Sequence, residues 1–335
     1  TPTYDVPAGL AVTTTYRRIT TSTVNGVGCT ANSNDITVTV NAVTGGTIAA
    51  AQTICSGGDP FAFTESVGST GSGPLTYQWK YSTDGYGITL AITSTYDVPA
   101  GLAATTTYRR ITTSTLGGVT CTAASNDIIV TVNSVTGGTI AAAQTICNGG
   151  DPAAFTESVL STGSGALTYQ WKQSTDGYTA ILAITAAYDV PSGLTATTTY
   201  RRITTSTLGG VPCTATSNDI IVTVQSAVTG GAIASAQTIC SGGDPAAFTE
   251  SSASSGSGAL TYEWKRSTDG YSATLATTVT YDVPAGLAAA TTYRRITTST
   301  LNGVTCIANS NDVIVSINAV TGGTIAAAQT ICSGG

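Results

Sequence analysis

The chain has 335 residues, of which only 9% are charged, and it contains neither histidine nor methionine. The absence of histidine removes the commonest general base and the commonest metal ligand, and a net charge of −6 disfavours nucleic acid as a partner. No run of residues is long and apolar enough for membrane insertion. Composition therefore favours a structural or binding protein over an enzyme.

A repeat of about 92 residues organises the sequence. The string TYRRITTST begins at Thr15, Thr107, Thr199 and Thr292. The third interval is one residue longer, and the extra residue falls in the stretch 225–227, which we interpret as a domain boundary. We therefore predict five sections of a longer array: the C-terminal part of a repeat at 1–41, three complete repeats at 42–133, 134–225 and 226–318, and the start of the next repeat at 319–335.

The first complete repeat illustrates the predicted strands in chain order. Alternation of apolar and polar residues and a high content of Thr, Val, Ile and Tyr indicate half-buried β-strands. We expect strands at 46–55, 61–66, 75–81, 105–115 and 120–132, with weak strands in 86–96. The order matches a sandwich of about 100 residues. We predict an all-β fold of tandem immunoglobulin-like or fibronectin-like β-sandwich domains, arranged as a rod or filament.

Two local signals refine the strand prediction. Dipeptides suited to positive φ stand between the last two strands of each repeat, at Asn25-Gly26, Gly117-Gly118, Gly209-Gly210 and Asn302-Gly303, and they predict tight hairpin turns. Large aromatic residues occupy inward-facing positions of two strands. The predicted structural core therefore includes Trp79, Trp171 and Trp264, together with Tyr16, Tyr108, Tyr200 and Tyr293.

Each repeat carries two cysteines, which in a chain without histidine favours disulfides in an oxidising compartment. Sandwich topology places the cysteine of the first strand near the last hairpin of the following repeat. This predicts disulfides between repeats, Cys55–Cys213 and Cys147–Cys306, and partners outside this sequence for Cys29, Cys121, Cys240 and Cys332. Pairing within repeats, Cys55–Cys121 and Cys147–Cys213, remains open as the alternative.

Eight of the twelve cationic residues are adjacent arginine pairs. Neighbouring strand residues face opposite ways, so one arginine of each pair should point toward the core or its rim. There it would pack on Trp79 or pair with an acid such as Asp97 or Glu65. The alternative is an exposed cationic stripe that binds acidic polysaccharide. The pairs are Arg17/Arg18, Arg109/Arg110, Arg201/Arg202 and Arg294/Arg295.

We identify no catalytic residues, no metal site and no cofactor. Serine and cysteine have no histidine to activate them, and the acids lack the spacing of calcium ligands. The cysteine spacing contains no Cys-x-x-Cys, which disfavours zinc. The remaining functional alternatives are a structural or adhesive filament and a carbohydrate-binding array.

Several motifs together resemble a known group of repeats. These are GGTI followed by QTICSGGDP, then LTYQW, TYRR, and GVTCTA followed by VTVN. They resemble the tandem immunoglobulin-like repeats of Bacteroidota cell-surface proteins, of the kind found in giant gliding-motility adhesins and other type IX-secreted surface adhesins. The resemblance implies secretion, display on the outer cell surface and a role as a stalk, filament or adhesin. The predicted inter-repeat disulfides make neighbouring repeats of the same chain its expected partners. A high-threonine surface also suggests lateral self-association into fibres, and the surface or polysaccharide ligand stays unknown.

Overall fold

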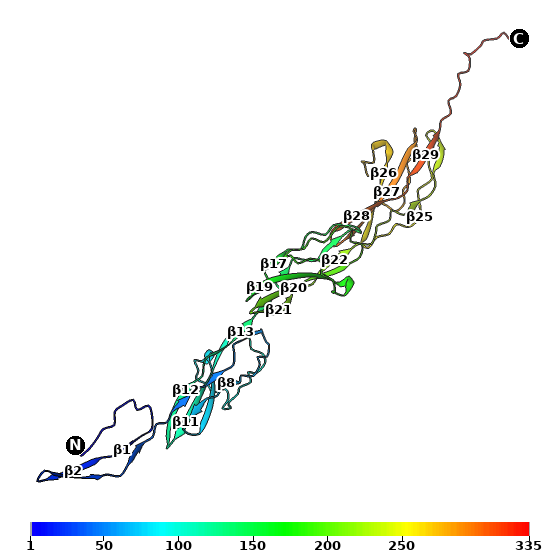
Figure 1. The fold of residues 1–335 in the computed structure, drawn as a ribbon. Helices are drawn as coiled ribbons and strands as arrows, with labels where there is room; N and C mark the ends of the chain where they lie inside the picture. The colour runs from blue at the N-terminus through cyan, green and yellow to red at the C-terminus, as the bar shows by residue number, and fades with distance from the viewer. Residues whose placement is uncertain (1, 335) are drawn as a thin grey trace. The chain divides into compact units, whose positions relative to one another are not determined.

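The computed structural model describes residues 2–334, which form β-strands joined by turns and three short 3₁₀ helices (Figure 1). In the first complete repeat the elements are β5 (Val43–Thr44), β6 (Thr47–Ile48), β7 (Gln52–Cys55), β8 (Glu65–Val67), β9 (Thr70–Gly71), β10 (Leu75–Tyr81), η1 (Ser82–Asp84), β11 (Thr106–Leu116), β12 (Val119–Ala124) and β13 (Ile128–Asn133).

The next two repeats follow the same plan. The second contains β14 (Val135–Thr136), β15 (Thr139–Ile140), β16 (Gln144–Ile146), β17 (Glu157–Val159), β18 (Thr162–Gly163), β19 (Ala166–Gln173), η2 (Ser174–Asp176), β20 (Thr198–Leu208), β21 (Val211–Thr216) and β22 (Ile220–Val224). The third contains β23 (Ala232–Ile233), β24 (Gln237–Cys240), β25 (Glu250–Ser252), β26 (Ala259–Arg266), η3 (Ser267–Asp269), β27 (Thr291–Leu301), β28 (Val304–Asn309) and β29 (Val313–Asn318).

Each complete repeat is a two-layered sandwich. In the first, one layer has the strand order β10-β11-β13-β7, with β12 paired to the far half of β11. The edge strand β7 runs parallel to β13, and the other pairings in this layer are antiparallel. Short antiparallel pairs, β5 with β9 and β6 with β8, make the second layer. The predicted all-β, immunoglobulin-like fold is confirmed.

Three strand boundaries differ from the prediction. The strand expected at 61–66 lies instead at β8 and β9, because the Gln52 side chain holds both the N–H and the C=O of Phe61. The last strand is interrupted between β12 and β13, where the Asn126 side chain bonds to the backbone of Ile48 in the other layer. The weak strands expected in 86–96 reduce to a single bridge between Phe63 and Tyr96.

The aromatic residues form the centre of each core. Trp79 is completely buried, and its ring centroid lies 5.6 Å from that of Phe63. Phe63 in turn lies 5.3 Å from the ring of Tyr108, which is 3% exposed. The other two cores repeat this arrangement, with Trp171 and Trp264 fully buried and Tyr200 and Tyr293 at most 2% exposed.

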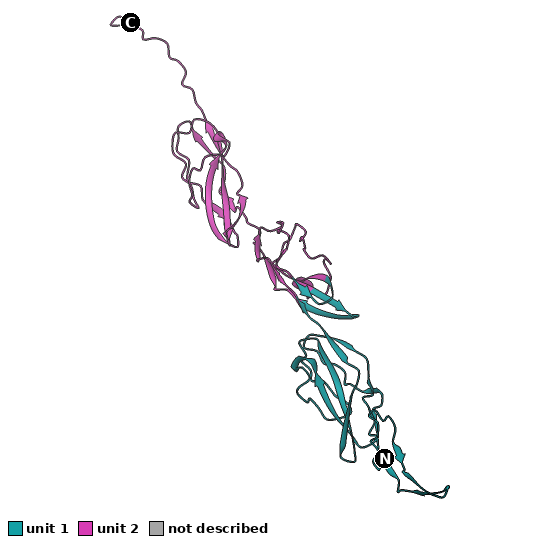
Figure 2. Ribbon diagram, turned by 90° about the vertical axis from the view of Figure 1, so that its left-hand side faces the viewer, with its two compact units in different colours: residues 1–136, 161–168, 204–215 teal, residues 137–160, 169–203, 216–335 magenta. Residues whose placement is uncertain are grey.

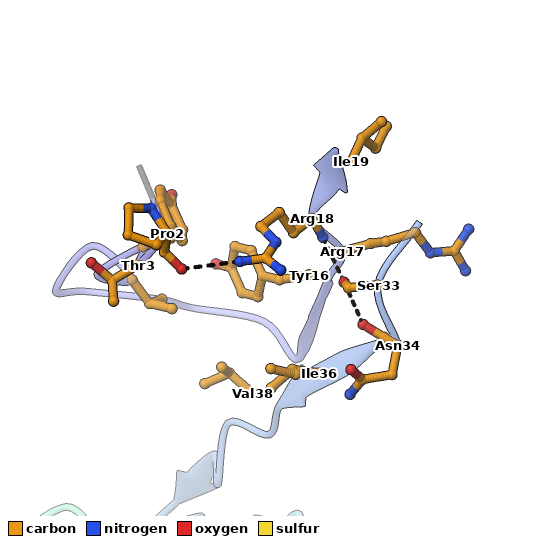
Figure 3. Close-up of a pocket in the computed structure, with 12 residues that line it drawn as sticks. Pro2, Thr3, Tyr16, Arg17, Arg18, Ile19, Ser33, Asn34, Ile36 and Val38 are labelled. Atoms are coloured by element: carbon orange, nitrogen blue, oxygen red, sulfur yellow. Dashed lines mark hydrogen bonds between the residues drawn. The ribbon is translucent and has the colours of Figure 1, made fainter. Parts of the chain in front are cut away.

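Residues 2–41 contain only four strands, β1 (Thr14–Tyr16), β2 (Ile19–Val24), β3 (Val27–Asn32) and β4 (Ile36–Val38). They leave an open cavity of about 690 Å³ (Figure 3). Tyr16 lines it and is half-buried against Tyr4, so residues 2–41 do not enclose it as the complete repeats enclose Tyr108. The reason is that no counterparts of Phe63 and Tyr81, whose rings pack on Tyr108, lie within these residues.

Backbone contacts divide the chain into two compact units (Figure 2). Unit 1 comprises 1–136, 161–168 and 204–215, and unit 2 comprises 137–160, 169–203 and 216–335. Unit 1 therefore holds the first complete repeat together with the hairpin of the second. Unit 2 holds the third repeat together with the core of the second.

Candidate functional site at the junction between repeats

The last hairpin of each repeat is long and closes in a two-residue turn. In the second repeat β20 and β21 meet at Gly209 and Gly210, whose φ angles are 56° and 79°. In the third, Asn302 and Gly303 have φ angles of 50° and 82°. Two consecutive positive φ angles define the type I′ turn that matches strand twist, so these dipeptides fix the hairpin register.

The tips of these hairpins lie against the preceding repeat. Within unit 1, a Cβ added to Gly209 would stand 3.0 Å from Thr53 Oγ1 on β7. Within unit 2, Asn302 Nδ2 donates a hydrogen bond of 3.1 Å to Thr145 Oγ1 on β16. The hairpin of one repeat therefore reaches back to β7, or to its equivalent β16, in the repeat before it.

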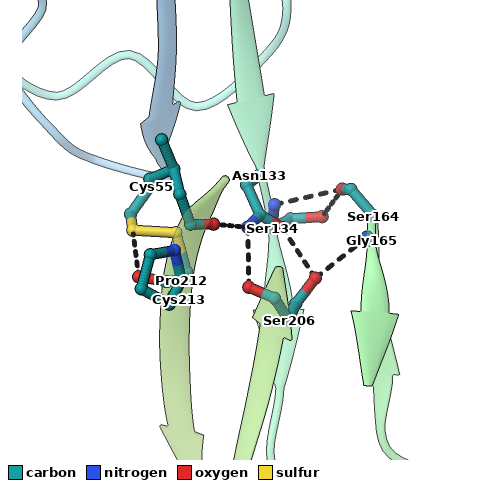
Figure 4. Close-up of a disulfide and its surroundings, with 9 residues drawn as sticks. Cys55, Asn133, Ser134, Ser164, Gly165, Ser206, Pro212 and Cys213 are labelled. Atoms are coloured by element: carbon teal, nitrogen blue, oxygen red, sulfur yellow. Dashed lines mark hydrogen bonds between the residues drawn. A yellow bond between two sulfur atoms is a disulfide. The ribbon is translucent and has the colours of Figure 1, made fainter. Parts of the chain in front are cut away.

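A buried asparagine at the end of β13 enters the hairpin of the second repeat (Figure 4). The Asn133 Nδ2 group donates to the carbonyl oxygens of Ser206 and Val211 at 2.8 and 2.9 Å. Its Oδ1 accepts from the Ser206 hydroxyl at 2.7 Å. Because Asn133 has no exposed surface, these contacts replace water for both ends of the amide. We call this arrangement the amide lock.

The amide lock recurs at the junctions on either side. Asn41 makes the same three contacts with Ser114 and Val119. Gln225 takes the place of asparagine at the longer junction, where its Nε2 donates to Val304 O at 2.9 Å and its Oε1 accepts from Ser299 Oγ at 3.2 Å. The longer side chain thus accompanies the extra residue that the sequence carries there.

We predict that Asn133→Ala lowers the free energy of unfolding by about 1–3 kcal/mol, because two buried carbonyls and a hydroxyl lose their partner. The measurement is urea denaturation of the full chain with its disulfides intact. Ser134→Ala is the matched control, since the adjacent Ser134 makes its hydroxyl contact with Ser164 at an exposed position. Equal midpoints for the two variants would contradict the role of the amide lock.

A disulfide lies beside the amide lock. Cys55 bonds to Cys213 with a Cα–Cα distance of 5.5 Å (Figure 4). The parallel register of β7 and β13 pairs Cys55 with Asn133, so the disulfide and the amide enter the same hairpin side by side. In unit 2, Cys147 bonds to Cys306 with a Cα–Cα distance of 5.7 Å. These are the two inter-repeat pairs expected from the sequence.

Pairing within repeats is not found among the described residues. Cys55 sits at the end of β7 opposite Asn133, whereas Cys121 pairs with Ser114 in the part of the β11–β12 hairpin that lies beyond β13. Cys121 is half-buried and unbonded, and Cys29, Cys240 and Cys332 are exposed and unbonded. Their expected partners in other repeats stay a prediction.

In each of the three complete repeats, one arginine of the pair is buried at the rim of the core. Arg110 has no exposed surface, and its Nη2 bonds to Glu65 and to the Gly45 carbonyl. The guanidinium also lies 4.7 Å from the Tyr77 ring and 5.9 Å from the Trp79 ring. The acid is therefore Glu65 and not Asp97. The same contacts join Arg202 to Glu157 and Arg295 to Glu250.

The other arginine is half-exposed and already paired. Arg109 Nε and Nη2 bond to both carboxylate oxygens of Asp127 at 2.8 and 2.9 Å, and this hydrogen bonding raises the pKa of Arg109. Its guanidinium covers the ring of Tyr86 at 4.1 Å. Arg201 and Arg294 repeat the pattern on Tyr178 and Tyr271. Because each of these arginines binds an acid and covers a ring of its own domain, the interpretation as a cationic stripe for acidic polysaccharide is weakened.

The first arginine pair lies in the open part of unit 1. Arg17 pairs with Asp35, and Arg18 donates to the Pro2 carbonyl at 3.2 Å (Figure 3). Arg18 is exposed, unlike its counterpart Arg110, because residues 2–41 provide no carboxylate at the Glu65 position. Residues 2–41 therefore do not bury one arginine of this pair as the three complete repeats do.

Across residues 2–334, no three or more Cys, Asp or Glu side chains cluster in a way that could hold a metal ion. None of the helices among the described residues is long and apolar enough to cross a membrane. The amide lock instead recurs at three junctions, at Asn41, Asn133 and Gln225, and a disulfide accompanies it at the last two.

Sequence comparison finds one protein family with three matches. Its profile, described as a domain of unknown function (DUF8696), matches residues 44–134, 136–226 and 229–319. No curated protein matches the sequence.

Three solved structures illustrate the structural similarity. The three N-terminal domains of the bacteriophage RB49 Highly Immunogenic Outer Capsid protein (Hoc) are 14% identical, cover 84% of this chain and 100% of theirs, and give a TM-score of 0.38. Extracellular domains 3–5 of Drosophila OTK are 11% identical, cover 82% of this chain and 96% of theirs, and give a TM-score of 0.28. Immunoglobulin domains 1–5 of Sidekick-1 are 16% identical, cover 81% of this chain and 58% of theirs, and give a TM-score of 0.27. Because each TM-score is below 0.5, no function is inferred from them.

Proposed function

Because this chain belongs to the DUF8696 family and carries three of its domains in tandem, we propose that it is a non-enzymatic structural or adhesive segment of a long cell-surface protein. The observation that carries the proposal is the junction, where Asn133 and Cys55 of one repeat both enter the hairpin of the next. A chain that only tethered independent domains would not need a buried lock and a covalent bond at that point.

The disulfides support an extracellular location, since such bonds persist in oxidising compartments. The finer part of the proposal is that the protein belongs to a bacterium of the Bacteroidota, leaves the cell by type IX secretion, and acts as a filament or adhesin stalk. In that role it would display distal adhesive regions for gliding or surface attachment. The support for this part is the resemblance of the repeated motifs.

Surface labelling of intact cells tests the proposal. Antibodies raised against the purified chain should label cells that have not been permeabilised, and antibodies against a cytoplasmic protein should label only permeabilised cells. Labelling of both proteins only after permeabilisation would contradict display on the surface. Binding of the full chain to a glycan array would instead favour the carbohydrate-binding alternative.

A further inference from the structure

The two disulfides interlock along the chain. Their cysteines alternate in sequence order, with Cys147 lying between Cys55 and Cys213, and Cys213 lying between Cys147 and Cys306. Neither bond therefore closes a loop that is separate from the other. This is a property of the covalent connectivity, and it holds whether the domains are folded or unfolded.

The connectivity places three chain segments in parallel between two covalent nodes. One node is the Cys55–Cys213 bond and the other is the Cys147–Cys306 bond. The segments 55–147, 147–213 and 213–306 each run from one node to the other, and by residue number they span 92, 66 and 93 residues. The shortest of them, within the second repeat, limits how far the nodes can separate.

We infer that the interlocked disulfides are an extension stop that gives this chain a further, mechanical function under tension. With both bonds intact, the path from Cys55 to Cys306 contains 66 residues, or about 230 Å when fully extended. With neither bond, the path contains all 251 residues between those two positions, or about 880 Å. The bonds thus reduce the maximal extension of this stretch about fourfold.

The interlocking also predicts a non-additive response to the loss of each bond. Without Cys55–Cys213 the shortest path is the segment 55–147, and without Cys147–Cys306 it is the segment 213–306. Whichever bond is lost first, its loss therefore adds only 26 or 27 residues to the shortest path, about 90 Å. Loss of the remaining bond then adds a further 159 or 158 residues, about 550 Å.

Force spectroscopy on the full oxidised chain tests this inference. Handles are attached through cysteine-free peptide tags at the two ends, and the contour length is measured after complete unfolding. Three variants are compared with the unmodified chain: Cys55→Ser with Cys213→Ser, Cys147→Ser with Cys306→Ser, and all four substitutions together. The matched control is Cys121→Ser with Cys240→Ser, which removes two unbonded thiols.

We expect each paired variant to lengthen the chain by about 90 Å, the fourfold variant by about 650 Å, and the control to leave it unchanged. Pairing within repeats would instead lengthen each paired variant by twice 66 residues, about 460 Å, and would overturn the inference. Equal lengths for all chains would also overturn it. The inference deepens the proposed structural role, but the measurement reads only the covalent path, so it can fail while surface labelling succeeds, or the reverse.

Discussion

Replacing Trp79 by alanine should destabilise the first complete repeat by about 3–5 kcal/mol. The side chain has no exposed surface, and its ring lies 5.6 Å from Phe63 and 5.7 Å from Tyr96. Its indole Nε1 also donates to the Thr93 carbonyl at 3.0 Å. Truncation therefore opens a large cavity and leaves a carbonyl without its partner.

Hydrogen exchange followed by mass spectrometry can locate this effect. At 1.36 kcal/mol for each tenfold change, protection of the slowest amides in β10 and β11 should fall by about 10²–10⁴-fold. The third repeat, whose own Trp264 is unchanged, serves as an internal standard. Phe61→Ala is the matched control, because Phe61 is 85% exposed in the same repeat and should change stability by at most about 0.5 kcal/mol. Similar losses of protection in both variants would contradict a core role for Trp79.

Much of the fold follows from the sequence because its strands are half-buried. Alternation in 75–81 and 105–115 identifies β10 and β11 almost to the residue, and it places Trp79 and Tyr108 on the inner face. The hairpin turn is also predicted correctly from the sequence, since Gly117 and Gly118 both adopt positive φ. Once these elements are ordered in a sandwich, the topology alone favours Cys55–Cys213 over Cys55–Cys121.

The sequence is less informative where one side chain decides the backbone's course. Asn126 interrupts the last strand by bonding to Ile48, 78 residues away, and no local pattern indicates such a partner. Asn133 reads as an ordinary residue at the end of a strand, so the amide lock was not predicted. Only its recurrence as Asn41 and Gln225, at the same place before each boundary, could have drawn attention to it.

The acid that pairs with Arg110 shows a similar limit. Alternation predicts that one arginine of the pair faces inward, but it does not choose between Glu65 and Asp97. The choice depends on β8, whose position the sequence places a few residues too early. Likewise, the ring of Tyr86 recurs as Tyr178 and Tyr271, yet only the structure shows that Arg109 and its equivalents already cover these rings.

Replacing Glu65 by glutamine should destabilise the first complete repeat by about 3 kcal/mol. Removing one partner of a buried ion pair costs about 3–5 kcal/mol because the remaining charge is left uncompensated. We expect the lower end, since the Glu65 side chain is 26% exposed and Arg110 keeps its bonds to the carbonyls of Gly45 and Ser94. Asp127→Asn is the matched control, because its half-exposed pair with Arg109 should be worth at most about 1 kcal/mol.

The Glu65–Arg110 pair should also make stability depend on pH. Burial acts to raise the pKa of Glu65, but hydrogen bonds from Arg110 and Ser69 outweigh it, and the pKa lies below its ordinary value. Glu250, beside Arg295, is shifted in the same direction. A carboxyl group whose pKa is lower in the folded state contributes stability above its unfolded pKa of about 4.3, and this contribution is lost as the pH falls through the folded pKa.

Urea denaturation between pH 7 and pH 2 provides the measurement. The first repeat of the unmodified chain should lose stability below about pH 4.3, and the Glu65→Gln variant should lose less over the same range because the titrating group is gone. The third repeat, which keeps Glu250, should show the full acid dependence in both proteins and so serves as the internal control. If the first repeat of the variant instead lost as much stability as that of the unmodified chain, the buried pair would not be the source of the acid sensitivity.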